Sequence, residues 1–359
     1  MRYLVFTNTP KHVHVYKYVV RELERRGHDV LILARDYGCT IDLLDWYDLP
    51  YEEYGTCGTS KYSLFRRLPG HYARIIRSAR RFAPDFIFGY GAYAAHAGLL
   101  TGATTVLVTD SEVETLDMGI SRPFVDAILT PYTYGTDLGS VHYTFNGFNE
   151  CAYLHPEVFS SRPDVRDWLG IGDDPFVLLR FNAFGSHHDV GVAGFTPSQR
   201  RRLIEQLADS VTVFVSDEGG DLDFADLPAR PYDAHPALLH DVLAEAELLV
   251  ADTQTMVTEA ALLGTPAIRS NSFAGGDDMG NFLELERQGL ISNFAEFDAV
   301  LSRARLLLEG GEHDSWLERR DSFMADKVNL TDLLVEIALA QSVNVSPRLS
   351  ARAATSKVG

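Results

Sequence analysis

Short apolar segments alternate with amphipathic segments along most of the chain. The apolar segments at 2–7 and 30–34 predict strands, and residues 12–26 between them carry apolar side chains at helical spacing. Strands separated by single helices are typical of parallel sheets, because parallel neighbours need a crossover connection. The pattern therefore predicts βαβ units.

The same rhythm continues and predicts two sets of elements. The first set adds strands at 86–88, 105–109 and 127–130 and helices at 70–82 and 92–100. The second set has strands at 176–181, 211–216 and 248–251, helices at 196–208 and 256–263, and a helix that ends near Ala246. Residues 149–174 interrupt the periodicity with proline and glycine, so they are expected to connect two domains.

The predicted fold class is α/β, with two Rossmann-like, doubly wound and mostly parallel domains. We expect the domains at 1–155 and 156–325, a C-terminal helix at 326–345 that packs back on the first domain, and a tail at 346–359 without regular structure.

The charge balance excludes one class of partner. The chain has 50 acidic and 32 basic residues, a net charge of −18, and only five lysines. Such a surface resembles that of salt-in halophilic archaeal proteins, in which concentrated salt screens the self-repulsion. Nucleic acid is not an expected partner, because phosphate binding needs the opposite sign.

The cysteines and the lengths of the apolar runs indicate which structural classes of protein can be excluded. Three cysteines without a C-x-x-C pair predict neither a disulfide framework nor a cysteine-built zinc site. No apolar run reaches the roughly 20 residues of a membrane-spanning helix, and the first residues lack a secretory signal. We expect a cytoplasmic protein.

The most informative segment is 248–266. A strand is expected to end at Asp252, the turn Thr253-Gln254-Thr255 to cap a helix, and Glu259 to lie one turn inside it on an exposed face. Free amides at a helix start, with nearby hydroxyl groups, suit a pyrophosphate. A carboxylate at Glu259 can accept hydrogen bonds from two ribose hydroxyls. The alternative is a capped surface helix; a ligand site is favoured because sites gather at strand C-termini.

This segment resembles the nucleotide-sugar signature of GT-B glycosyltransferases and of non-hydrolysing UDP-N-acetylglucosamine 2-epimerases. The Glu-Ala-x-x-Leu-Gly-x-Pro frame of 259–266 matches, whereas 253–255 stands where those proteins have Ser-Gly-Gly. Two further segments, 9–14 and 143–156 with Gly147 and Glu150, resemble a largely archaeal family of this fold. The resemblance implies a GT-B arrangement, in which two Rossmann-like domains face a central cleft and the second domain binds the nucleotide sugar.

The segment after the strand 176–181 resembles the epimerase turn T-x-H-R-x-E-N, whose histidine faces the nucleotide sugar. The resemblance implies that Arg180 and His187 contact the nucleotide sugar, and that His188 with Asp189 performs acid–base chemistry. An ordinary polar turn and half of a metal site are the alternatives.

The turn after the strand 105–109 is similar to the epimerase turn H-x-E-A-G, with Glu112 at the acidic position. Asp110 or Glu112 could deprotonate an acceptor hydroxyl if burial raises the pKa of the carboxyl. A solvated acidic loop is an equally weighted alternative.

The first turn stands where GT-B proteins carry a glycine-rich loop, yet it contains no glycine. Asn8, Lys11, His12 and His14 are therefore candidate cleft residues, with a plain helix-capping turn as the alternative.

Residues 54–84 carry seven basic side chains and no acidic one. By resemblance to membrane-associated GT-B enzymes, this segment would meet a lipid-phosphate acceptor; a solvated helix face with internal ion pairs is the other interpretation. The basic residues proposed for that contact are Arg66, Arg67, Arg74, Arg77 and Arg81.

Two motifs imitate other sites. Gly89-x-Gly91-x-x-Ala94 resembles a dinucleotide fingerprint but belongs to a late βα unit, so close backbone packing is the preferred explanation. Asp221-Leu222-Asp223 resembles a metal-binding D-x-D within a simply acidic loop. We expect neither a metal nor a cofactor, and a nucleotide sugar as substrate.

The function expected from these features is that of a metal-independent glycosyltransferase that uses a nucleotide sugar. A 2-epimerase-like isomerase and a non-catalytic nucleotide-sugar-binding protein are the alternatives.

Overall fold

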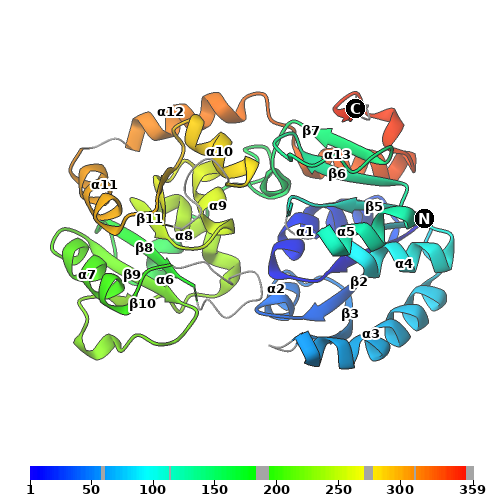
Figure 1. Ribbon diagram of the computed structural model, residues 1–359, viewed down its shortest axis with the longest axis horizontal. Coiled ribbons are helices and arrows are strands. Elements are labelled where there is room, and N and C mark those ends of the chain that lie inside the picture. Colours follow the sequence, from blue (N-terminus) through cyan, green and yellow to red (C-terminus); the bar gives the residue numbers. More distant parts are fainter. Residues whose placement is uncertain (58–60, 113–114, 183–193, 271–277, 311–312, 353–359) are drawn as a thin grey trace, which may run out of the picture. The chain divides into compact units, whose positions relative to one another are not determined.

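The computed structural model describes residues 1–352 except 58–60, 113–114, 183–193, 271–277 and 311–312 (Figure 1). The chain forms two compact units, which are described separately. Unit 1 is Met1–Val158 together with the C-terminal residues from Asp326, and unit 2 is Phe159–Ala325. The sequence placed these boundaries at 155/156 and 325/326.

Unit 1 contains an eight-stranded sheet in the order β14-β7-β6-β5-β4-β1-β2-β3. All neighbours pair in parallel except β14 and β7. The strands are β1 (Arg2–Thr7), β2 (Asp29–Asp36), β3 (Tyr51–Thr56), β4 (Phe86–Gly89), β5 (Thr104–Val108), β6 (Ala127–Pro131), β7 (His142–Phe145) and β14 (Leu349–Ala351). The strand order reverses direction between β1 and β4, which is the switch point where doubly wound sheets bind ligands.

The helices of unit 1 include one from the C-terminal part of the chain, α13, which contacts α1. They are α1 (Pro10–Arg25), α2 (Thr40–Trp46), α3 (Lys61–Phe82), α4 (Gly91–Thr101), α5 (Thr115–Ser121) and α13 (Leu330–Ala340). Helix α3 begins nine residues before the predicted start at Gly70 and runs through Pro69. The expectation of an unstructured tail was wrong for Leu349–Ala351, since β14 pairs with β7 at the sheet edge (Figure 1).

Unit 2 contains a fully parallel sheet of six strands in the order β10-β9-β8-β11-β12-β13. The strands are β8 (Phe176–Phe181), β9 (Thr212–Asp217), β10 (Arg230–Pro231), β11 (Leu248–Ala251), β12 (Ala267–Ser270) and β13 (Ser292–Phe294). The helices are α6 (Val165–Leu169), α7 (Pro197–Ala208), α8 (Leu239–Glu245), α9 (Thr255–Leu263), α10 (Gly280–Arg287), α11 (Phe297–Gly310) and α12 (His313–Met324). Its switch point lies between β8 and β11.

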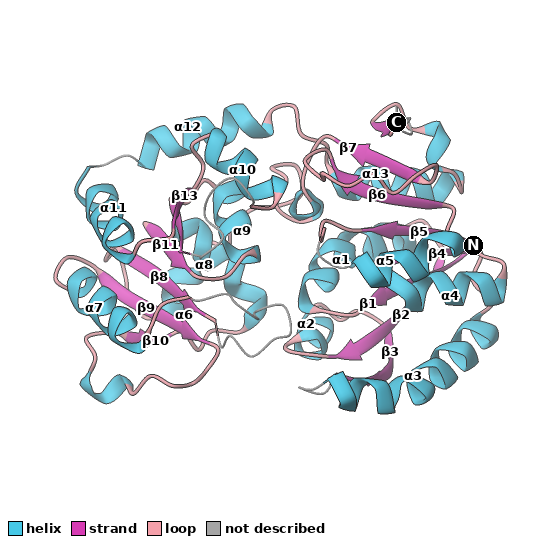
Figure 2. Ribbon diagram, in the orientation of Figure 1, coloured by secondary structure: helices cyan, strands magenta, loops and turns pink. Residues whose placement is uncertain are grey.

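The α/β fold class with two Rossmann-like, mostly parallel sheets is confirmed, and strands alternate with helices in both units (Figure 2). The central strands are completely buried, as in β4 and β11, which explains their apolar sequences. Within the described ranges, no helix is long and apolar enough to cross a membrane.

The glycines of the false dinucleotide motif serve packing. A Cβ atom at Gly89 would lie 2.5 Å from the Cβ of Ala94, and one at Gly91, whose φ is +70°, would lie 2.1 Å from Asp117 Oδ2. Asp117 also accepts a hydrogen bond from the backbone N–H of Ala92 (3.3 Å), so its carboxylate occupies the start of α4. A dinucleotide phosphate would have to displace this carboxylate.

Candidate functional site

A half-buried lysine joins two carboxylates at the C-terminal edge of the unit 1 sheet. Lys11, in the first turn of α1, lies with its Nζ 2.5 Å from Asp110 Oδ2 and 2.7 Å from Glu150 Oε1. Burial alone would lower the pKa of Lys11, but the two carboxylates raise it above its ordinary value, so the ammonium stays charged. The site therefore holds one cation between two potential acids.

Glu150 is a site residue of unit 1 that was not singled out as a candidate from the sequence. Its side chain is 2% exposed and comes from the 3-10 helix η2 (Asn149–Ala152), inside the stretch predicted to connect the domains. Burial raises the pKa of Glu150 against the opposing effect of Lys11, and its Oε2 has no hydrogen-bond partner among the described residues. Glu150 belongs to the segment 143–156 that carries the family resemblance, which was the available signal.

Asn8 and His12, which also belong to the first turn, form hydrogen bonds at the switch point of the unit 1 sheet. Asn8 Nδ2 donates to the carbonyl of Tyr90 (3.3 Å), which links the ends of β1 and β4, and Tyr54 Oη donates to Asn8 Oδ1 (2.8 Å). His12 Nδ1 accepts from the backbone N–H of Asn8 (3.2 Å). Burial, together with Lys11 and Arg35, lowers the pKa of His12 to about 3, so its ring is neutral at pH 7. Asn8 and His12 thus support the turn.

The structure buries His14 away from the turn. Its ring packs 5.3 Å from the ring of Tyr153 and 5.9 Å from that of Tyr47, and the residue is 6% exposed. Position 14 lies on the inward face of α1, whereas Lys11 is partly exposed. The geometry therefore assigns His14 to the core and Lys11 to the site.

The acidic turn after β5 contains both predicted carboxylates. Asp110 pairs with Lys11, whereas Glu112 lies half-buried beside Gly135 in the segment between β6 and β7: a Cβ there would be 3.1 Å from Glu112 Oε2. Tyr134 Oη donates to the carbonyl of Ser111 (3.4 Å). Lys11 thus forms its ion pairs with Asp110 and Glu150 and not with Glu112, so the carboxylate of Glu112 is the one that this lysine does not neutralise.

In unit 2, Asp252 ties the two strands of the switch point together. Its Oδ1 accepts from the backbone N–H of Asn182 (2.7 Å), which follows β8, and its Oδ2 accepts from that of Phe195 (3.2 Å). The residue is 2% exposed, and burial raises the pKa of its carboxyl to about 6. Asp252, at the start of the candidate nucleotide-sugar segment, is itself a candidate contact of the sugar, and here both of its oxygens accept hydrogen bonds from backbone N–H groups.

Replacing Asp252 with asparagine should lower the free energy of unfolding by about 1–3 kcal/mol at pH 7, because one backbone N–H would face an amide NH₂ group. The penalty should be larger at pH 4. The native Asp252 binds a proton more readily than the unfolded residue, so wild-type stability contributed by this group falls as pH rises from about 4 to 6. Urea unfolding of both proteins at the two pH values measures this; an equal penalty at both would contradict the raised pKa.

The turn before α9 differs from the predicted hydroxyl cap. Gln254 occupies the N-cap position of α9, and its side chain makes no capping hydrogen bond among the described residues. Gln254 and Thr255 are exposed, whereas Thr253 Oγ1 is buried and has no hydrogen-bond partner among the described residues. Among the described residues, the turn thus presents helix amides without a capping side chain beside a hydroxyl group without a partner, which suits an anion.

Glu259 is buried, which corrects the expectation of an exposed helical acid. Its Oε1 accepts from His240 Nε2 (3.0 Å), and the two side chains are 5% and 3% exposed. Every residue of α9 from Met256 to Leu263 is buried, so the surface-helix alternative is wrong. His240, on α8, was not identified from the sequence, because nothing in its spacing relates it to Glu259.

Arg180 points along the C-terminal edge of the same sheet. Its Nη1 donates to Ser216 Oγ (2.6 Å) and its Nη2 pairs with Glu218, both at the end of β9. His187, His188 and Asp189 lie outside the described residues.

The five arginines of α3 that were proposed to meet a lipid phosphate divide into two groups. Arg67 donates to Thr56 Oγ1, Arg74 to the carbonyl of Tyr54 (3.3 Å), and Arg81 forms an ion pair with Glu52. Arg66 and Arg77 are exposed, and neither has an ion pair in the described part of the chain.

Nowhere in the described ranges do three His, Cys, Asp or Glu side chains gather in the manner of metal ligands.

At the level of sequence, no protein-family model and no curated protein matches the chain. Its structure is similar to that of UDP-GlcNAc 2-epimerase from Neisseria meningitidis bound to UDP-GlcNAc, with a TM-score of 0.65 and 12% identity over 95% of this chain and 100% of that one. The chain has a GT-B-type fold. The forosaminyltransferase SpnP is similar too (TM-score 0.65, 14% identity, 95% and 99% covered), as is Anabaena HepE in complex with UDP-glucose (0.60, 13%, 95% and 100%).

Proposed function

We propose that this protein is a metal-independent glycosyltransferase that uses a nucleotide sugar, with UDP as the nucleotide, in the synthesis of a surface glycan or glycolipid. The observation that carries the proposal is the start of α9, where amides without a capping side chain and the hydroxyl of Thr253, which has no hydrogen-bond partner within the described ranges, lie at the switch point of unit 2. This combination suits a diphosphate. The structurally similar Neisseria epimerase is bound to UDP-GlcNAc and Anabaena HepE is in complex with UDP-glucose, which supports a nucleotide-sugar ligand.

The sugar donor would lie against unit 2. Thr253, Gln254 and Thr255 would contact the diphosphate, Arg180 would neutralise part of its charge, and Glu259 would accept hydrogen bonds from the ribose. Glu259 needs a small shift toward the ligand for this, because its Oε1 now accepts from His240. His187, His188 and Asp189 stay candidates for the contact with the sugar and the β-phosphate.

Unit 1 would supply the acid–base chemistry. The acceptor hydroxyl loses its proton to Glu112 or Asp110 as its oxygen bonds to the anomeric carbon, and the bond from that carbon to the diphosphate breaks. The amides at the start of α9 stabilise the departing diphosphate, so no metal ion is required for charge neutralisation. We expect turnover to be unaffected by a chelator.

A UDP-GlcNAc 2-epimerase-like isomerase is the second candidate, favoured by the fold of the Neisseria enzyme and by the acid at position 112. Incubation with UDP-GlcNAc alone, followed by proton NMR, separates the possibilities. A transferase leaves the sugar unchanged until an acceptor is added, whereas an isomerase produces a new epimer without one. Binding with neither reaction, across a panel of acceptors, would indicate a non-catalytic nucleotide-sugar-binding protein and would overturn the proposal.

The exposed arginines of α3 suit a lipid-phosphate acceptor at a membrane surface, where each cation contributes about 1 kcal/mol at ordinary ionic strength. We expect vesicles rich in phosphatidylglycerol to bind the protein, and the double variant Arg66→Gln/Arg77→Gln to bind them about tenfold or more weakly. The matched control is Arg25→Gln/Arg26→Gln at the C-terminal end of α1, where both arginines pair with Glu22. Equal binding by the two double variants in a flotation assay would refute this surface.

A further inference from the structure

The segment between β6 and β7 rests directly on the acidic turn of unit 1. Gly135 leaves room for Glu112, since a Cβ atom there would lie 3.1 Å from Glu112 Oε2. The neighbouring Tyr134 is 4% exposed, and its hydroxyl donates to the carbonyl of Ser111 (3.4 Å). The position of Glu112 therefore depends on where this segment lies.

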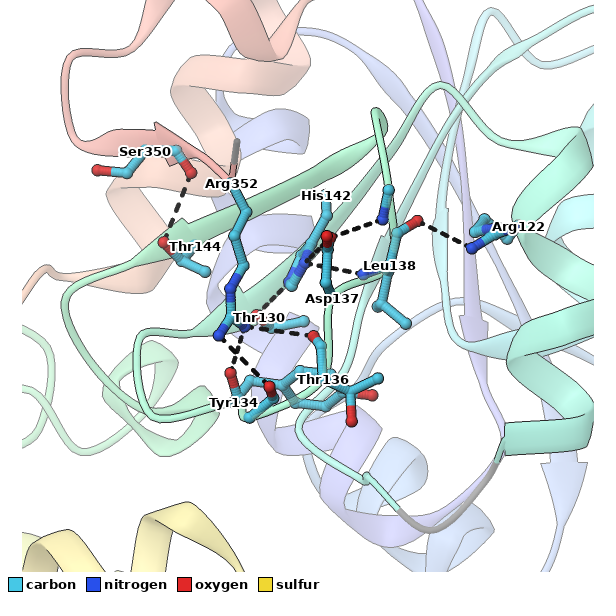
Figure 3. Close-up of polar contacts among 12 residues, drawn as sticks. Arg122, Thr130, Tyr134, Thr136, Asp137, Leu138, His142, Thr144, Ser350 and Arg352 are labelled. Carbon is cyan, nitrogen blue, oxygen red and sulfur yellow. Dashed lines mark hydrogen bonds and ion pairs between the residues drawn. The ribbon is translucent and has the colours of Figure 1, made fainter. Parts of the chain in front are cut away.

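One side chain from the C-terminal end of the chain holds the segment. Arg352 follows β14, and its backbone N–H donates to the carbonyl of His142 (3.1 Å). Its guanidinium donates to three successive backbone carbonyls: that of Tyr134, that of Thr136 (3.2 Å) and that of Gly135 (3.4 Å). Figure 3 shows this side chain reaching from the strand edge to the segment.

A buried histidine fixes the other end of the same segment. His142 Nδ1 accepts from the backbone N–H of Leu138 (3.2 Å), and its Nε2 donates to Thr130 Oγ1 (2.9 Å). Burial and the nearby Arg352 lower the pKa of His142, while Asp137 opposes this shift. His142 thus holds Leu138 through its Nδ1, and Arg352 is the charged group that holds residues 134–136 (Figure 3).

We propose that Arg352 is a positioning residue for Glu112, so that the C-terminal strand completes the acidic turn of unit 1. The guanidinium fixes three carbonyls, the fixed segment presents Gly135 and Tyr134 to the turn, and the turn places Glu112. Every contact in this series lies within unit 1. The catalytic consequence rests on the proposed function of Glu112 as a base, but the positioning does not.

The variant Arg352→Gln tests the proposal, because glutamine can reach at most one or two of the three carbonyls. The matched control is Arg348→Gln, which lies four residues earlier and pairs with Glu336 instead. Hydrogen–deuterium exchange of the backbone amides at 109–112 and 134–138 should accelerate in Arg352→Gln and stay at the wild-type rate in the control. Arg352→Lys should restore part of the protection, since an ammonium group can still donate to these carbonyls.

A second variant reaches Glu112 without touching the guanidinium. Gly135→Ala places a methyl group against Glu112, so with UDP-GlcNAc and an acceptor both this variant and Arg352→Gln should lower kcat about 10- to 100-fold with KM nearly unchanged. The effects of the two changes should be less than additive in the double variant.

Two results overturn the proposal. The first is faster exchange at 134–138 in Arg352→Gln with unchanged exchange at 109–112, and the second is strict additivity of the two changes in kcat. If the wild type shows no turnover, the proposed function fails, and the exchange data alone still decide whether Arg352 positions the turn.

Discussion

Replacing Lys11 with methionine should lower the free energy of unfolding by about 3–5 kcal/mol and abolish turnover. Glu150 is almost fully buried and would lose its cation, and Asp110 would face it as a second carboxylate without compensation. The loss should be smaller at pH 5 than at pH 8, because one of the two carboxyls can then take up a proton. Urea unfolding monitored by circular dichroism measures the change.

The double variant Lys11→Met/Glu150→Gln provides the control. It removes the buried negative charge together with the cation, so it should recover a substantial part of the stability that Lys11→Met loses. A loss below about 1 kcal/mol in the single variant, or no recovery in the double variant, would show that these three side chains do not act as one buried unit.

The variant Glu259→Gln should bind a nucleotide sugar about 10- to 150-fold more weakly, because charge-assisted hydrogen bonds to ribose contribute about 1.5–3 kcal/mol. It should also unfold more easily by about 1–3 kcal/mol. An exposed helical glutamate would hardly contribute to stability, but the buried pair with His240 makes Glu259 structural as well.

Calorimetric titration with UDP-GlcNAc and urea unfolding separate these two effects. The matched control is Glu205→Gln, an exposed glutamate of α7 in unit 2, which should change stability by less than about 0.5 kcal/mol and leave affinity unchanged. A folded Glu259→Gln protein with wild-type affinity would remove Glu259 from the proposed donor site.

The sequence predicted most of the central strands, because strands buried on both faces form continuous apolar runs, but it missed the short buried strand β12, which reads Ala-Ile-Arg-Ser. It did not reveal β3, which reads Tyr-Glu-Glu-Tyr-Gly-Thr, or β7, which reads His-Tyr-Thr-Phe, because edge and short strands carry polar side chains. The C-terminal residues are mostly polar, so the sequence pattern did not predict β14 either. This strand joins the sheet through backbone pairing with β7.

The candidate site was predictable only where a residue follows its own strand. Asp110 and Asp252 were placed correctly at strand ends, since parallel strands all end at one edge of a sheet. The pairings of Lys11 with Glu150 and of Glu259 with His240 join different elements, and spacing along the chain carries no information about them. The apolar composition of α9 on all sides was a signal of burial that pattern analysis could have used.

A crystal structure of the protein with UDP tests the central claim most directly. The account predicts a diphosphate whose oxygens accept hydrogen bonds from the amides at the start of α9 and from the hydroxyl of Thr253, with the ribose beside Glu259. UDP bound away from the switch point of unit 2, or no bound UDP at concentrations that saturate enzymes of this fold, would contradict it.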